Sequence, residues 1–271
     1  MNYNDKRLIA VCGGILLLGI AGTATAQTEH DSEPRSQRDS ENSLGLGVGI
    51  APEYLGARDS RVQLVPMVVV MQGPFYLDST RGVGYRHETR SGLFFGQSLN
   101  WDPGRTDHDS KSRPGSDRLR GMGTVKGSLI TSLEVGYYFA PWLAVRAESE
   151  FALTERDRGN RFSLGLEGGL WSEGKNDIWY STNAYFSDGR FAQSYFGVTS
   201  DQSAASGFSR YTPDRGFYAY SASINWEHRF DKHWSAMISV NAVSLADDAR
   251  KSPIVQESLN TFALGAINYI F

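Results

Sequence analysis

The sequence has almost no cysteine and no long apolar run after its first 26 residues. Cys12 is the only cysteine among 271 residues, which excludes an internal disulfide and a cysteine metal site. No later stretch stays apolar for the ~20 residues of a membrane-spanning helix. The formal net charge is only -3, with both signs interspersed, so nothing indicates a nucleic-acid partner. A membrane protein built of helices is excluded, whereas one built of strands is not, because its strands show only alternation.

The first 26 residues have the pattern of a secretory signal peptide. Lys6 and Arg7 precede an apolar stretch over residues 8–20, and Ala24-Thr25-Ala26 follows it. A positive region, an apolar region and an A-x-A site predict cleavage before Gln27, which also removes Cys12. The apolar stretch, about 13 residues long, is too short to be a spanning helix.

The next segment, "QTEHDSEPRSQRDSEN" over residues 27–42, is nearly free of apolar residues. This composition cannot form a core and predicts a disordered periplasmic leader. Residues 43–271 are rich in glycine, tyrosine, phenylalanine and tryptophan, yet the mean hydropathy of the chain is negative. We therefore expect one large β domain over 43–271.

Period-two alternation runs through this domain. In "SLGLGVGIAPEY", the apolar side chains of Leu44, Leu46, Val48 and Ile50 share one face, and glycines occupy the other. The second face of such stretches is mostly glycine, alanine, serine and asparagine with isolated charges, which suits a confined lumen better than a solvated sheet. The other clear stretches are 129–139, 143–152, 162–170, 178–186, 218–228, with Tyr218 and Tyr220 expected on one face, and 234–245.

Aromatic residues gather near the ends of these stretches, as in the belts where spanning strands leave the hydrocarbon. We assign to the belts Trp101, Tyr137, Tyr138, Phe139, Trp142, Trp171, Trp179, Trp226, Phe230 and Trp234.

The connections alternate between short and long. Short links fall near Gln72, Arg90, Pro141, Lys175 and Lys232, and the alternate links are longer, apart from a tight one near residues 79–82. This predicts an all-β fold: a transmembrane antiparallel β-barrel of about twelve strands in the cell outer membrane, with short periplasmic turns and longer extracellular loops. The least certain strands are 75–79 and 83–88, without which the count is about ten.

The end of the chain, "LGAINYIF", fits a closing strand. An even strand count places both termini in the periplasm, and the last strand must pair with the first to remove the open edge. Tyr269 and Phe271 then lie in the inner aromatic girdle, and a terminal phenylalanine is the feature that barrel-assembly machinery recognises in its clients.

Several charged residues fall on the expected inner face. Charges in a membrane protein usually face a lumen and pair with one another. Two interpretations stay open: a salt-bridged interior that fills the barrel, or a constriction that attracts cations. The residues are Glu134, Arg146, Glu148, Glu150, Glu167, Glu227 and Arg86.

Nothing in the sequence assembles an active site or a cofactor site. The segment "TDHDS" over residues 106–110 has an Asp/His pair but lies in a charged, polar loop, and a solvated loop explains it. The loop over residues 187–216 carries many aromatic residues, so it folds over the lumen, docks a partner or packs on itself. We expect no enzymatic activity and no cofactor.

Three segments carry a resemblance to a known family: "LGLGVGIAPEYLGARD", "SYFGVTSDQSAASGFSRYTPDRG" and "DDARKSPIV" before the closing strand. From about Ser43 to Phe271 the chain resembles the MipA/OmpV family, the MltA-interacting outer-membrane proteins. The resemblance implies a scaffold that links a lytic murein transglycosylase to a penicillin-binding murein synthase in cell-wall biogenesis. Other members are porin-like or adhesive, so a narrow channel for small solutes and a surface adhesin are the alternatives.

Overall fold

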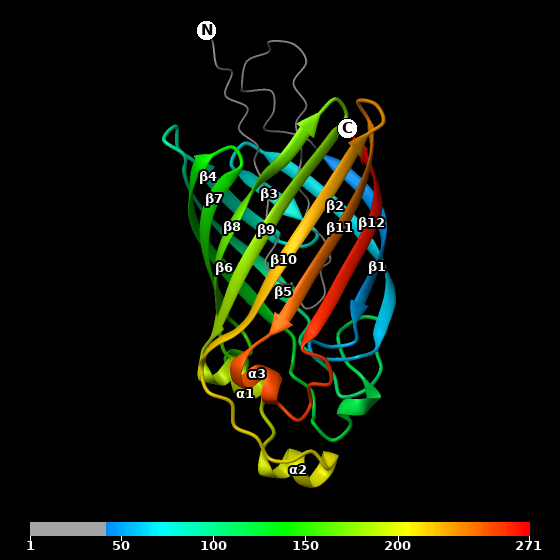
Figure 1. The fold of residues 1–271 in the computed structure, drawn as a ribbon, viewed down its shortest axis with the longest axis vertical. Helices are drawn as coiled ribbons and strands as arrows, with labels where there is room; N and C mark the ends of the chain where they lie inside the picture. Colours follow the sequence, from blue (N-terminus) through cyan, green and yellow to red (C-terminus); the bar gives the residue numbers. More distant parts are fainter. Residues whose placement is uncertain (1–41) are drawn as a thin grey trace.

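The computed structural model describes residues 42–271, which form a closed antiparallel barrel of twelve strands (Figure 1). The predicted fold, including the uncertain third and fourth strands, is confirmed. The predicted signal peptide and nearly all of the predicted leader lie outside the described residues. The strands are β1 (Ser43–Pro52), β2 (Ser60–Gln72), β3 (Phe75–Asp78), β4 (Gly82–Glu88), β5 (Leu93–Asp102), β6 (Ser128–Ala140), β7 (Leu143–Ala152), β8 (Arg161–Glu173), β9 (Asn176–Ser187), β10 (Gly216–Arg229), β11 (Trp234–Leu245) and β12 (Leu259–Ile270).

The alternation in β1 sets which face of the strand meets lipid. Leu44 and Leu46 point outward and are exposed, whereas Gly47 and Gly49 face the lumen and are buried. A Cβ atom on Gly45 would lie 2.0 Å from Asn268 Oδ1, so glycine there lets the inner side chains of β12 approach the β1 backbone. The apolar face therefore points to the bilayer, as a transmembrane barrel requires.

The barrel closes where the last strand meets the first. Ser43 pairs with Ile270 and Ile50 with Ala263, and the amide of Phe271 donates to the carbonyl of Asn42 over 2.9 Å. The seam leaves no open edge between β1 and β12, which satisfies the backbone in a medium without water.

The links at the two ends of the barrel differ in size, as predicted. The long links carry all the helices of residues 42–271 at one end: α1 (Gly189–Phe196), α2 (Ser200–Ser206), α3 (Asp247–Lys251), η2 (Asp117–Leu119) and η3 (Arg156–Arg158) (Figure 1). Because short turns are periplasmic in such barrels, this is the extracellular end. None of the helices in residues 42–271 has the length and apolarity to cross a membrane.

Three aromatic assignments were wrong. Trp179 faces inward from β9 with 0 % of its surface exposed, and Tyr138 faces inward from β6, where it packs on Phe94 at a centroid distance of 5.0 Å. Tyr218 does not share a face with Tyr220, because a register shift between Phe217 and Ala219 turns it into the lumen. The position of an aromatic residue in the sequence shows that it is near a strand end. It does not show whether the side chain faces lipid or the lumen, and a bulge reverses the face that alternation predicts.

Candidate functional site

A network of buried ion pairs crosses the inner face of β6, β7 and β8. Arg146 is 3 % exposed, and its Nη1 donates to Glu148 Oε2 over 2.8 Å. Its Nε lies 3.4 Å from Glu167 Oε2, and its Nη1 lies 3.9 Å from Glu134 Oε2. The Arg146 guanidinium therefore lies within 4 Å of three carboxylates. Their attraction to it offsets part of the cost of removing these charges from water.

Arg86 on β4 extends this network towards the periplasmic end. Its Nη1 lies 3.6 Å from Glu134 Oε1, and its Nη2 donates to the Tyr138 hydroxyl over 3.2 Å. The guanidinium carbon lies 4.2 Å from the centre of the Phe94 ring. Cation–π contact and ion pairing together fix the aromatic pair inside the lumen.

Two further ion pairs lie on the extracellular side of this network. Arg161 on β8 grips Glu150 with both Nε and Nη2, the latter over 3.0 Å. Arg158 in η3 donates to Asp102 and to the Tyr195 hydroxyl. Each buried charge here has a partner of opposite sign, which favours a filled interior over a row of free carboxylates.

Glu227 is the remaining charge that the sequence places on the inner face. It is buried on the inner face of β10, and the β9 residue directly opposite it is Asp177. The expected inner-face charges therefore lie on the inner faces of β4–β8 and of β10, where Glu227 is near the periplasmic end.

The extracellular mouth is filled by the loop between β9 and β10. The rings of Phe191 and Tyr195 stack at 4.4 Å, and Phe191 and Phe196 meet Tyr218 at 5.5 and 5.7 Å. All four are buried in one apolar cluster with residues of the barrel wall. One cavity beside them measures about 10 Å³, at the lower limit for a single water molecule. A second cavity, of about 290 Å³, lies between Phe196, Tyr218 and the residues of α3. The loop folds inward over the lumen.

Two arginines that hold this cap escaped sequence analysis. Arg105 Nη1 donates to the Tyr195 carbonyl over 2.8 Å, and Arg158 joins the same tyrosine to Asp102. Both arginines come from loops that look solvated in sequence. The one sequence feature that the two arginines share is that each lies within three residues of a strand end. From there a long side chain can turn into the mouth of the barrel.

The Asp/His pair in residues 106–110 does not form an enclosed active site. Thr106 Oγ1 lies 2.7 Å from His108 Nδ1, and Asp107 Oδ1 lies 3.4 Å from the same nitrogen. The His108 side chain is 59 % exposed, which is typical of a solvated loop residue. Within residues 42–271, no group of three or more histidine, cysteine, aspartate or glutamate residues could hold a metal ion.

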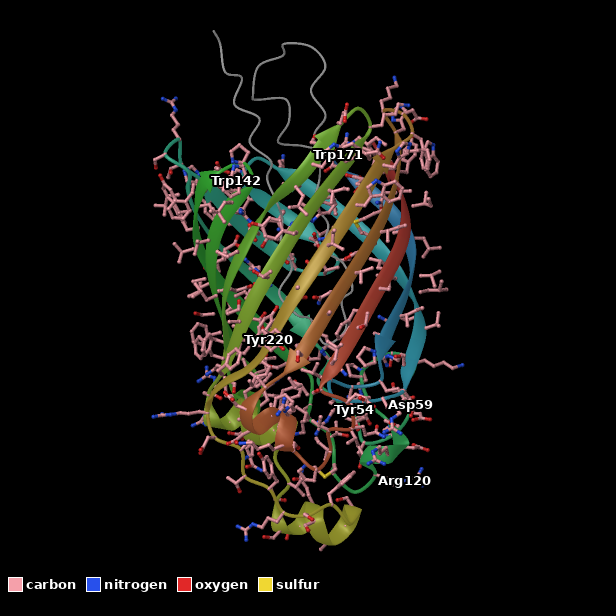
Figure 2. The ribbon with its side chains drawn as sticks, in the orientation of Figure 1. Tyr54, Asp59, Arg120, Trp142, Trp171 and Tyr220 are labelled. Atoms are coloured by element: carbon pink, nitrogen blue, oxygen red, sulfur yellow. The ribbon has the colours of Figure 1, made fainter. Side chains whose placement is uncertain are left out.

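The periplasmic end presents small turns ringed by aromatic residues. Trp142 and Trp171 lie at this end, and Tyr54, Asp59 and Arg120 lie at the opposite one (Figure 2). In the turn after β10, Asp231 accepts the amides of His233 and Trp234 over 2.7 and 2.9 Å. These amides, that of His233 first, lower the pKa of Asp231. Asp231 is therefore ionised at neutral pH.

A closed antiparallel barrel with an apolar outer face, aromatic residues at its inner rim and a plugged mouth defines the class of outer-membrane β-barrel proteins. The family described as MltA-interacting protein MipA matches residues 44–271. The chain therefore belongs to the MipA family, in agreement with the resemblance found in its sequence, and it is a protein of the outer membrane.

Several solved outer-membrane proteins are similar to the chain at low identity. In-vitro folded OmpT of Vibrio cholerae is 10% identical, with 86% of this chain and 97% of that chain covered and a TM-score of 0.40. The anion-selective porin of Comamonas acidovorans is 10% identical, with 85% and 98% covered and a TM-score of 0.40. A bacterial polysaccharide outer membrane secretin gives a TM-score of 0.44 at 10% identity, with 86% and 99% covered. No curated protein matches the chain.

Replacing Phe271 should lower the amount of folded barrel in the outer membrane severalfold. Phe271 is 67 % exposed, and its ring lies 5.2 Å from Tyr269, so little folded-state packing depends on it. A loss in Phe271→Ala would therefore reflect recognition during assembly. The readout is the heat-modifiable band on a gel of isolated outer membranes. Phe139→Ala is the matched control, because Phe139 is 65 % exposed at the same rim; equal amounts from both variants would refute the assembly role.

Proposed function

We propose that this protein is a non-enzymatic outer-membrane scaffold that links a lytic murein transglycosylase to a penicillin-binding murein synthase. Family membership supports the proposal, since the family is described by its interaction with MltA. The observation that carries it is the filled lumen, in which an aromatic cap and buried ion pairs occupy the space a solute would need. We expect such a barrel not to conduct and to act through its surfaces.

Murein lies in the periplasm, so the contact must use the periplasmic face. Each short turn is too small to bury alone the ~800 Å² per partner of a stable interface. The leader over residues 27–42 is joined to this face. Asn42 directly precedes β1, and its carbonyl accepts a hydrogen bond from the Phe271 amide at the seam. A polar segment that orders on binding adds contact area at an entropic cost, which keeps the affinity modest.

Removing residues 27–41 should weaken capture of a lytic transglycosylase about tenfold or more, an order of magnitude that corresponds to ~1.4 kcal/mol. Asn42 is kept, because its side chain accepts the Met71 amide over 3.0 Å and its carbonyl accepts that of Phe271. The measurement is co-purification of the transglycosylase and the synthase with the barrel from detergent extracts.

The control replaces residues 189–215 with a short turn and should leave capture unchanged, provided that the barrel still shows heat-modifiable migration. The reverse result, with capture lost on loop replacement and kept without the leader, would refute a periplasmic scaffold. It would favour the adhesin alternative, since that loop is extracellular.

A further inference from the structure

A cavity lies between α1 and α3 at the extracellular end of the barrel (Figure 1). We call it the α1–α3 pocket; it is lined by both helices and by residues between 213 and 218. It measures about 290 Å³, whereas the cavity that Arg146 lines inside the lumen measures about 30 Å³. Pockets for small molecules begin at ~300 Å³. The α1–α3 pocket therefore has room for one or two rings.

Hydrogen bonds hold the walls of this pocket in place. The Ala246 amide, directly before α3, donates to the Tyr218 carbonyl on β10 over 2.8 Å. Directly after α3, Ser252 Oγ donates over 2.5 Å to the carbonyl of Phe196, the last residue of α1. Because α3 is bonded to both β10 and α1, the pocket is part of the folded barrel and needs no ligand to form.

The floor of the pocket is apolar. Five buried side chains form it: Ala192, Phe196, Pro213, Tyr218 and Ala249. The rings of Phe196 and Tyr218 lie 5.7 Å apart and belong to the apolar cluster of the cap. A polar group placed against this floor would lose its hydrogen bonds to water without replacing them. The ligand must therefore present carbon to the floor.

The rim of the pocket carries charges of both signs, on Asp214, Arg215, Asp247, Asp248 and Lys251. Lys251 Nζ lies 3.0 Å from Asp248 Oδ1, and Asp248 Oδ2 accepts the Asp214 amide over 3.2 Å, so these two charges already have partners. Among residues 42–271, nothing forms a hydrogen bond or an ion pair with the side chains of Asp214, Arg215 and Asp247. Two carboxylates and one guanidinium are therefore available to a ligand.

The balance of these charges favours a neutral ligand. The lining has three carboxylates and two cationic groups, and α1 and α3 each carry one further exposed arginine outside the lining, Arg190 and Arg250. Neither sign prevails, so an anion and a cation would each meet groups of its own sign. A hydroxyl group both donates and accepts, so it can donate to the free carboxylates and accept from the free guanidinium. Hydrogen bonds to charged groups are about twice as strong as those between neutral groups.

A sugar ring meets the requirements of both floor and rim. One face of a pyranose carries C–H groups that can cover the apolar floor, and its edge carries the hydroxyl groups that the rim needs. A flat aromatic ligand would cover the floor but leave the free charges of the rim against carbon. An open-chain polyol would satisfy the rim but has no continuous apolar face.

The pocket lies at the level of the outer aromatic belt. Phe217, which lines it, packs on the outward-facing Phe186 at a centroid distance of 5.6 Å. Tyr220, three residues along β10, is 54 % exposed on the lipid side (Figure 2). Such aromatic residues mark the membrane interface. A sugar reaches this level either as the head group of an outer-leaflet lipid or free in the external solvent, and both sources present the same chemistry.

We propose that the α1–α3 pocket binds a neutral pyranose ring. The C–H face of the ring lies on the floor beside Phe196 and Tyr218. Its hydroxyl groups donate to Asp214 and Asp247 and accept from Arg215. The site is independent of the proposed scaffold function, because the pocket is extracellular and the scaffold contact is periplasmic.

The test is saturation-transfer NMR on the folded full-length chain in lauryldimethylamine oxide, a detergent without sugar. The probes are the methyl glycosides of glucose, galactose, mannose and N-acetylglucosamine, which differ in the directions of their polar groups. Sorbitol is the open-chain control. We expect at least one glycoside to receive saturation at its ring protons, severalfold more than sorbitol does. No saturation of any of the four, or equal saturation of sorbitol, would overturn the proposal.

Two rim substitutions locate the binding. Asp214→Ala combined with Asp247→Asn should lower the saturation severalfold, because one carboxylate is removed and the other loses its charge. Asparagine is used at 247 because the φ angle there is 43°, a left-handed value that it tolerates. Asp201→Ala is the matched control, since Asp201 is exposed on α2 outside the lining. Equal saturation in the double variant and the control would refute binding in this pocket.

The charge preference is tested with glucosamine and glucuronate, which should both receive less saturation than the best neutral glycoside. Stronger saturation of either one would refute a neutral ligand. The source of the sugar is tested in phosphatidylcholine nanodiscs, with and without a diacylglycerol that carries the best glycoside. Loss of the free-glycoside signal with this lipid assigns the site to a lipid head group, and an unchanged signal assigns it to a free saccharide. The rim variants should capture the transglycosylase normally, which separates this site from the scaffold function.

Discussion

Arg146→Met should lower the free energy of unfolding of the barrel by about 3–5 kcal/mol, the cost of breaking a buried ion pair by removing one partner. Arg146 lies within 4 Å of carboxylates on Glu134, Glu148 and Glu167, and all of these side chains are inside the lumen. Methionine fills a similar volume but leaves the acids without their shared cation. The measurement is urea unfolding in detergent or lipid, followed by the heat-modifiable band.

A matched substitution at the surface should cost far less. Arg58 pairs with Glu257 at 3.2 Å, but the side chains are 68 % and 51 % exposed. Exposed pairs contribute about 0–1 kcal/mol, so Arg58→Met should unfold near the wild-type urea concentration. Adding Glu167→Gln to Arg146→Met should restore part of the loss, because one uncompensated charge is removed. Equal stabilities for the Arg146 and Arg58 variants would contradict the buried network.

The barrel itself could be predicted because its signals are local. Leu44 to Ile50 alternate, the connections change length with a fixed parity, and the chain ends on an aromatic strand. Period-two patterns and turn residues act over a few neighbours, so one sequence is enough to reveal them. The short pair β3 and β4 was uncertain because four residues carry too little alternation to separate a strand from a loop.

The interior could be predicted only in part. Inner-face charges follow from strand parity, so Arg146 and Glu148 could be assigned to the lumen, but their partners depend on side chains that reach across strands. Trp179 and Tyr138 were misplaced because an aromatic near a strand end looks the same whether it faces lipid or the lumen. The cap formed by Phe191, Tyr195 and Tyr218 depends on contacts between a loop and a bulge, which no local pattern encodes.

The wild-type protein should show no steady conductance in planar bilayers, and replacing residues 189–215 with a two-residue turn should open a cation-selective pore. The replacement keeps the pairing of Ser187 with Arg161 and removes the stacked rings of Phe191 and Tyr195. It also removes the Tyr195 hydroxyl that Arg158 contacts. A twelve-stranded barrel lies between the small packed barrels and the open porins, so a removable cap decides whether ions pass.

The selectivity of the opened barrel should depend on the carboxylates beneath the cap. In the capless variant, Glu148→Gln combined with Glu150→Gln should shift the reversal potential in a salt gradient towards anions. Ser149 lies between the two glutamates in sequence, and its side chain is on the outer face of β7, opposite Leu133. Ser149→Ala should therefore leave the reversal potential unchanged. A capless barrel that still does not conduct would place the block in the Arg146 network, whereas steady conductance in the wild type would favour the narrow-channel alternative over the scaffold.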